Sequence, residues 1–179
     1  MRGEDFLRYV YDELTYQIAN AIGLAMVDAI INSPATSSAT APAVPQITKA
    51  VAVDTIATAI SQLSDEATNP VIIMNKATWA NFKAVQYANG YGVDVFEGLP
   101  VLFSVALNAY DTATAGDEYL IVGDLENGAM ANFPNGQDIT LKFDDLSLAE
   151  KDLIKIVGRE YVGLGVVAPY HFVVVKKPA

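Results

Sequence analysis

Apolar residues recur at every fourth position near the start of the chain. The members of this stripe are Leu14, Ile18, Ile22, Met26 and Ile30. A stripe at this spacing is typical of an amphipathic α-helix, and we predict one helix over Glu4–Asn32, ended by Ser33-Pro34. At ~1.5 Å per residue this helix would be about 42 Å long, which is about the diameter of a compact chain of this size. Such a rod indicates an elongated body, or a spine on which other copies pack.

The middle of the chain alternates between short helical and strand patterns. A Pro- and Ser-rich connector over Ser33–Pro45 precedes them. A second helix is predicted around Val53–Ser64, and the β-branched run Val71–Met74 predicts a buried strand. Asn75 follows this strand directly, and we expect it to cap a third helix.

The second half of the chain is richer in strand patterns. Glu118–Gly123 is an apolar run, and we expect Gly128–Phe133 to pair with it. The segment Ile139–Phe143 alternates apolar with polar residues, as in a half-buried strand, and Asn108–Asp117 is a loop of small residues. The remaining predicted strands are Val101–Val105, Lys155–Val167 and His171–Lys177. Helices early and strands late indicate the fold class α+β.

Composition limits the classes of function. Hydrophobic residues make up 52% of the chain and charged residues 18%, which is enough apolar material for one domain or two small interlocked ones. A net charge of −10 argues against a protein that grips nucleic-acid backbones, because that requires clustered lysine and arginine. The absence of cysteine excludes disulfides, thiolate catalysis and zinc–thiolate sites. Neither a transmembrane helix nor a signal peptide is expected.

One glycine motif is similar to a phosphate-binding loop. Gly163, Gly165 and Ala168 fit the pattern G-x-G-x-x-A of dinucleotide-binding enzymes. That chemistry requires a helix to begin at the glycines, so that its N-terminus meets the pyrophosphate. Here two valines and a proline follow, and these residues favour a strand. We therefore interpret the glycines as strand positions and assign no cofactor.

The titratable side chains give no reaction centre. His171 is the single histidine of the chain, and we interpret it as a hydrogen-bonded structural residue, because metal and general-base sites usually recruit partners. Asp144-Asp145 and Asp124-x-Glu126 could offer oxygen ligands to a hard cation, but neither has the spacing of a calcium loop. We interpret both pairs as solvated turn carboxylates. The sequence thus predicts no catalytic, metal or cofactor residue, and no enzyme.

The order of the segments is distinctive. A long helix ends at "DAIINSP", and a strand and helix follow as "PVIIMNKATWANFKAV". Then come "GYGVDVFEGLPVLFSVAL" and "EYLIVGDLENGAMANF", and the chain closes with "IVGREYVGLGVVAPYHFVVVKK". Over nearly the whole chain, this succession resembles the C-terminal portion of tailed-bacteriophage major capsid proteins, the family with the Hong Kong-phage capsid fold.

The resemblance implies a phage major capsid fold with two intertwined parts. A peripheral domain would comprise residues 1–32 and 128–168, with the long spine helix and an elongated β-sheet. An axial α/β domain would comprise residues 33–127 and 169–179, with a central sheet flanked by helices. Its tip loop, for which Asn108–Asp117 is the candidate, would surround the symmetry axis of a pentamer or hexamer.

The resemblance also implies a function and partners. The chain would self-assemble, as hexamers and pentamers, into the icosahedral head shell of a tailed bacteriophage or prophage. It would be made in the bacterial cytoplasm and located in the virion, with portal, scaffold or maturation protease as a further partner. It would enclose DNA without sequence-specific binding and would involve no membrane. The family carries an N-terminal arm and an extended loop before the spine helix, and this sequence begins at the helix, so we assign no lysine of the family's covalent crosslink.

Two other hypotheses stay open. A shell protein of an encapsulin-like bacterial nanocompartment would have the same fold but would enclose an enzyme cargo docked by a short peptide. A small α/β enzyme or ligand-binding domain would instead need a deep pocket with converging polar groups. The contents of a shell, DNA or cargo, distinguish the first of these from a phage capsid.

Overall fold

The chain forms two compact units. A computed structural model describes residues 3–33, 43–90, 92–134, 136, 139–144 and 155–179. The first unit comprises residues 1–23 and 131–163, and the second comprises residues 24–130 and 164–179. Most of the predicted connector Ser33–Pro45 lies outside the described residues, as does Asp145.

The predicted N-terminal helix is confirmed. Helix α1 runs from Gly3 to Ile31, and its first turns belong to the first unit and its last turns to the second. By length and apolar composition alone, its Asp5–Ile31 part could cross a membrane, contrary to the expectation from sequence. In the second unit, however, Val27 and Ile30 of this helix are buried in a protein core. Packing against the sheet therefore accounts for the apolar character of these turns.

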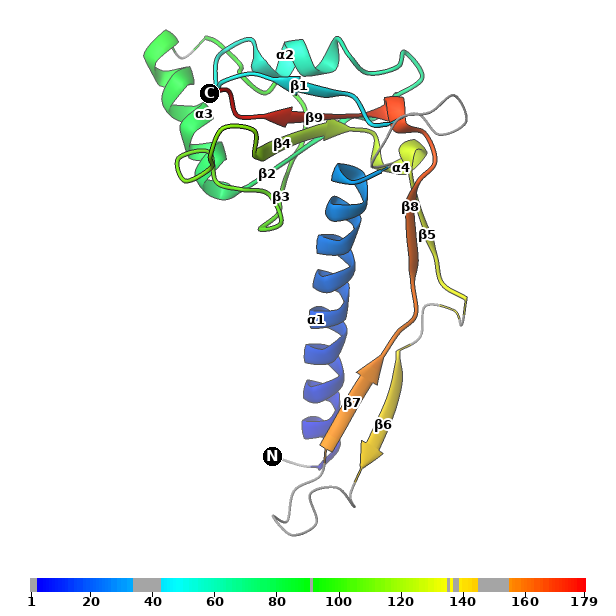
Figure 1. The fold of residues 1–179 in the computed structure, drawn as a ribbon. Coiled ribbons are helices and arrows are strands. Elements are labelled where there is room, and N and C mark those ends of the chain that lie inside the picture. Colours follow the sequence, from blue (N-terminus) through cyan, green and yellow to red (C-terminus); the bar gives the residue numbers. More distant parts are fainter. Residues whose placement is uncertain (1–2, 34–42, 91, 135, 137–138, 145–154) are drawn as a thin grey trace. The chain divides into compact units, whose positions relative to one another are not determined.

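A five-stranded mixed sheet is the centre of the second unit. Its strands lie in the order β1-β9-β4-β2-β3 (Figure 1). Strand β4 pairs antiparallel with both β2 and β9, whereas β1 pairs parallel with β9 and β3 pairs parallel with β2. The bounds are β1 Gln46–Thr48, β2 Val71–Met74, β3 Val101–Phe103, β4 Glu118–Gly123 and β9 Phe172–Lys176.

Both faces of this sheet are covered, which explains the continuous apolar runs of its inner strands. On one face, alternate residues of β2, β4 and β9 pack against helices α2 (Thr55–Ile60) and α3 (Lys76–Asn89), with Ile56 and Phe82 fully buried. On the other face, the intervening residues pack against the last turns of α1 (Figure 1). Phe172 of β9 is fully buried on this second face.

Local sequence signals position the helices of this unit. The Asn75 side chain accepts a hydrogen bond from the Ala77 backbone N–H, so the predicted cap of α3 is confirmed. Helix α2 is shorter than the predicted Val53–Ser64, because the segment after Ile60 continues in turns. The apolar residues of these turns still contribute to the core, since Leu63 packs against the buried cluster that contains Ile56 and Phe82.

The first unit contains an antiparallel pair of strands beside its part of α1. Strand β6 (Thr140–Asp144) pairs with β7 (Lys155–Arg159). Gly158 of β7 lies against the helix: a Cβ added there would be 3.5 Å from the side chains of Leu14 and Ile18. The face of α1 that was predicted to pack is therefore the face that does so.

One predicted strand pairing is wrong. Strand β5 (Ala129–Asn132), expected to pair with Glu118–Gly123, forms a two-stranded sheet with β8 (Gly163–Val166) instead. Both long edges of β4 are already occupied by β2 and β9. The short helix α4 (Leu125–Gly128) also separates β4 from β5, so no tight hairpin joins them.

Candidate functional site

The glycine motif lies in a strand, as predicted. Gly163 and Gly165 are part of β8, and Ala168 precedes a 3-10 turn, η2 (Pro169–His171). The chain then continues directly into β9. The helix N-terminus that would meet a pyrophosphate does not follow these glycines.

Asp124 is a buried structural carboxylate, and its interpretation as a solvated turn residue is wrong. It caps α4 and is fully buried. One carboxylate oxygen, Oδ1, accepts from the backbone N–H groups of Glu126 and Asn127, each at 3.1 Å. The other, Oδ2, accepts from the backbone N–H groups of Thr68 at 3.0 Å and Asn69 at 3.1 Å, and from the Asn127 side chain at 2.8 Å.

These hydrogen bonds decide the charge state of Asp124. Burial raises the pKa of its carboxyl, but the hydrogen bonds from Asn127, Asn69 and Thr68 outweigh burial and hold the pKa below its ordinary value. Asp124 is thus an anion whose acceptor sites face backbone and amide donors. Glu126 remains exposed and accepts one hydrogen bond from the Asn69 side chain at 3.3 Å.

His171 is buried, but not as the sequence suggested. Only 7% of the residue is exposed, and its Nδ1 has no hydrogen-bond partner among the described atoms. The expectation of a hydrogen bond therefore fails for this nitrogen. Within the described ranges, no three His, Cys, Asp or Glu side chains gather into a group that could hold a metal ion. The side chain of Asp144 and the whole of Asp145 lie outside the description.

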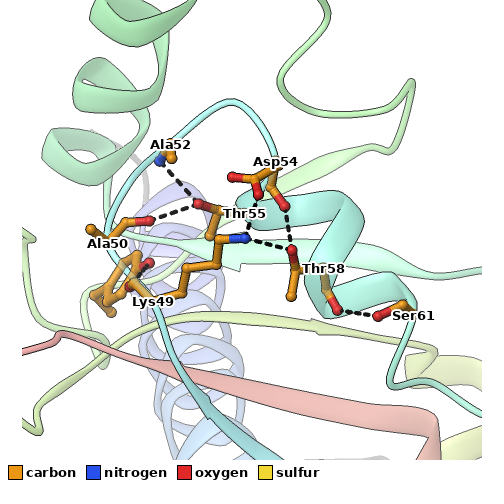
Figure 2. A network of polar contacts seen from close by, with 8 residues as sticks. Lys49, Ala50, Ala52, Asp54, Thr55, Thr58 and Ser61 are labelled. Carbon is orange, nitrogen blue, oxygen red and sulfur yellow. Dashed lines mark hydrogen bonds and ion pairs between the residues drawn. The ribbon is translucent and has the colours of Figure 1, made fainter.

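A polar network ties the segment after β1 to α2 (Figure 2). Lys49 donates to Asp54 Oδ2 and to Thr58 Oγ1, both at 2.6 Å. The Lys49 hydrogen bond holds the pKa of the Asp54 carboxyl below its ordinary value. The Lys49 carbonyl accepts from the phenol of buried Tyr119 at 2.7 Å. This network fastens α2 to the segment after β1.

A second lysine organises the loop Asn108–Asp117. Lys177 Nζ donates to the carbonyls of Tyr110 at 2.9 Å and Ala113 at 2.8 Å, and it lies 4.8 Å from the centre of the Tyr110 ring. The loop is also joined to α3, because Asn81 donates to Asp111 Oδ1 at 3.0 Å. The sequence indicated a run of small residues and a candidate tip loop here, but not the lysine that holds it, which is distant in the chain.

Large apolar side chains are exposed in both units. In the first unit most of them lie along α1, namely Phe6, Leu7, Tyr9, Tyr11 and Tyr16, and Tyr161 follows β7. In the second unit a group lies at and just after the edge strand β3: Leu102, Phe103 and Val105. The sequence indicated a spine on which other copies pack, but it did not identify which side chains stay exposed, since an apolar residue in a helix or strand pattern is expected in the core. A group of exposed apolar side chains marks a contact site, whereas a single exposed apolar residue is normal.

The first unit also has a shallow cavity of about 320 Å³. Its lining is mostly apolar, with Thr15 and Glu160 as polar members. Thr15 already uses its hydroxyl within α1, where it donates to the Tyr11 carbonyl at 2.8 Å. The cavity therefore has few polar groups that could orient a small molecule.

Comparison with known proteins gives a consistent match. The model of the phage capsid family matches residues 2–177. No curated protein matches the sequence. The family match spans both units and every helix and strand described above.

Solved shell proteins have a similar fold. The capsid of an empty GTA particle, with C5 symmetry, matches with a TM-score of 0.76 and 16% identity over 98% of this chain and 67% of that one. The encapsulin in the holo-SrpI complex of Synechococcus elongatus has a TM-score of 0.59 and 14% identity, over 93% of this chain and 65% of that one. The mature capsid of bacteriophage PhiM1 has a TM-score of 0.56 and 12% identity, over 99% of this chain and 68% of that one. The chain thus spans about two thirds of the length of these proteins.

Proposed function

Because the chain belongs to the phage capsid family, we propose that it is a major capsid protein whose copies assemble as hexamers and pentamers into a closed icosahedral head shell. The family match over residues 2–177 is the observation that carries this function. It also favours a structural shell protein over a small α/β enzyme. The location that follows is the virion of a tailed bacteriophage or prophage, after synthesis in the bacterial cytoplasm.

Exposed apolar surface supports self-assembly. Tyr16 is 66% exposed on α1, and Val105 is 77% exposed after β3. Soluble monomers rarely leave such groups clustered in the open, because each costs free energy in contact with water. In a closed shell each copy uses the same surfaces, and symmetry sets how the contacts close.

The resemblance to the family suggests a division of labour between two parts of the subunit, with bounds that differ from those of the two compact units. We assign the peripheral role to residues 1–32 and 128–168, which include α1, and the axial role to residues 33–127 and 169–179, which include the five-stranded sheet. Asn108–Asp117 is the proposed tip loop at the symmetry axis of a capsomer. Because Lys177 donates to two carbonyls of this loop, the loop would be held in one conformation.

The proposed contents of the shell are DNA, without sequence-specific contacts. The chain carries 21 acidic and 11 basic residues, so an inner surface with this balance would leave packaged DNA unattached. Portal, scaffold or maturation protease is the proposed further partner during assembly.

A nanocompartment shell is the second candidate function. The similarity in fold to the encapsulin of Synechococcus elongatus, with a TM-score of 0.59, supports it. Particles purified from cells after nuclease treatment distinguish the two functions. A phage head is expected to protect genomic DNA of defined length, whereas a nanocompartment would contain a single co-purified enzyme and no DNA. A protein that forms no particle in its natural reading frame would contradict both.

A further inference from the structure

Strand β3 is an edge of the central sheet with apolar side chains on both of its faces. Its inner edge pairs with β2, and no described strand covers its outer edge. Leu102 is 44% exposed, Phe103 is 50% exposed, and Val105, just after the strand, is 77% exposed. We call these three residues the β3 edge patch.

Strand β3 is short, at three residues, but the β3 edge patch lacks other common protections of a sheet edge. Edge strands normally carry a charge, a proline or a bulge, because their unpaired backbone groups otherwise attract another chain. Residues 101–105 contain no charged residue and no proline. The patch is therefore expected to be covered when the protein carries out its function.

A positive charge lies beside the patch. Lys76 at the start of α3 is exposed, and its Nζ lies 5.6 Å from the centre of the Phe103 ring. Trp79, one turn later, meets the same ring edge to face at 6.3 Å between centres. Aromatic anchors next to a cation favour a partner that brings both apolar contact and carboxylates.

The chain itself has the chemistry of such a partner. It has a net charge of −10, and among the described residues only Asp54 and Glu118 form ion pairs with lysine. Many carboxylates are therefore available to contact Lys76 of another copy. Because both copies carry the same net negative charge, a contact between a lysine and a carboxylate lowers the repulsion between them. We propose that the β3 edge patch, with Lys76 beside it, docks on a carboxylate-bearing surface of a second copy of this chain. This inference rests on the proposed function.

Two matched variants test the docking. Val105→Asp adds a charge inside the patch, and Val167→Asp adds the same charge at another valine of the second unit that is 62% exposed. Light scattering and sedimentation measure the concentration at which the protein, expressed from its natural reading frame, forms particles. We expect V105D to raise this concentration about tenfold or more, as loss of a central contact does, and V167D to change it by less than about twofold.

Circular dichroism and thermal unfolding show whether each variant folds, and Val105 is exposed enough that V105D should do so. Lys76→Glu adds a test of charge: its assembly should be weakest at low salt and approach that of the wild type as salt screens the contact. Particle formation by folded V105D at the wild-type concentration, or an equal loss in V167D, would overturn the docking surface alone. A wild-type protein that never forms particles would overturn the proposed function and this inference together.

Discussion

The carboxylate of Asp124 accepts a hydrogen bond from the backbone of Thr68, which lies 56 residues earlier in the chain, at 3.0 Å. With Asn69 and Asn127 it forms a buried clamp between the loop before β2 and the start of α4. A buried anion that satisfies this many donors is costly to replace, because the donors lose their partner while staying out of water.

Asp124→Asn is therefore expected to lower the free energy of unfolding by about 1–3 kcal/mol at pH 7, since the new amide group would face N–H donors. The native pKa of Asp124 lies below its ordinary value of ~3.9. The contribution of the carboxylate to the free energy of unfolding is thus fully present above the ordinary pKa. It is lost as pH falls through the lowered native pKa. Urea unfolding of both proteins between pH 7 and pH 3 measures the difference.

The matched control for this clamp is Glu126→Gln, which removes an exposed carboxylate two residues away. We expect it to change stability by less than about 0.5 kcal/mol. A stability gap between wild type and D124N that stays constant down to pH 3 would show that the charge of Asp124 plays no part.

Gly128→Ala is expected to destabilise the second unit. A Cβ on Gly128 would lie 2.5 Å from Phe172 Cε2 and 2.8 Å from His171 Cβ, and the fully buried Phe172 ring has no room to yield. We expect a loss of about 1–3 kcal/mol in urea unfolding. Gly23→Ala is the control, because a Cβ there meets nothing within 4 Å, and a glycine-to-alanine change inside a helix should stabilise by roughly 0.5–1 kcal/mol. Equal effects of the two variants would refute the close packing at Gly128.

Glu97→Gly is expected to stabilise the protein. Glu97 has φ 53° and is the one non-glycine residue with positive φ among those described. This conformation costs a residue with a side chain about 1–2 kcal/mol, which exceeds the extra unfolded-state entropy of glycine. The expected gain is up to about 1 kcal/mol in the free energy of unfolding. Glu66→Gly, at an exposed position without positive φ, should give no gain. A loss in E97G comparable to that in E66G would contradict this account.

Lys177→Met is expected to release the loop Asn108–Asp117. Methionine keeps the apolar stem but removes the donor to the carbonyls of Tyr110 and Ala113, with a cost of about 1.5–3 kcal/mol. Hydrogen exchange should rise at Gly116, whose N–H bonds to the Lys177 carbonyl. Lys176→Met removes only a partly exposed pair with Glu118 and should cost less than about 1 kcal/mol. The account fails if both variants leave exchange in the loop unchanged.

Local patterns were sufficient where one segment determines its own structure. The four-residue stripe gave α1, the β-branched run Val71–Met74 gave β2 with its bounds, and Asn75 gave the start of α3. In each case the signal is a spacing or a cap formed by residues within a few positions of each other. The interactions that form the element are therefore visible in the local sequence.

Features fixed by distant residues were not predictable in the same way. The donors that make Asp124 a buried anion come from Thr68 and Asn69, so its own neighbourhood still resembles a solvated turn. Strand β5 pairs with β8 rather than β4 because β4 has no free edge, a fact that only the complete sheet supplies. The exposure of Phe103 has the same origin, since β3 is an edge only through the order of the other strands.

The most direct test of the central claim is electron microscopy of the wild-type protein expressed from its natural reading frame. The account expects closed shells of uniform diameter whose surface resolves into fivefold and sixfold capsomers, with the same subunit fold in each. A preparation that holds only folded monomers, at concentrations well above those at which related shells form, would contradict it.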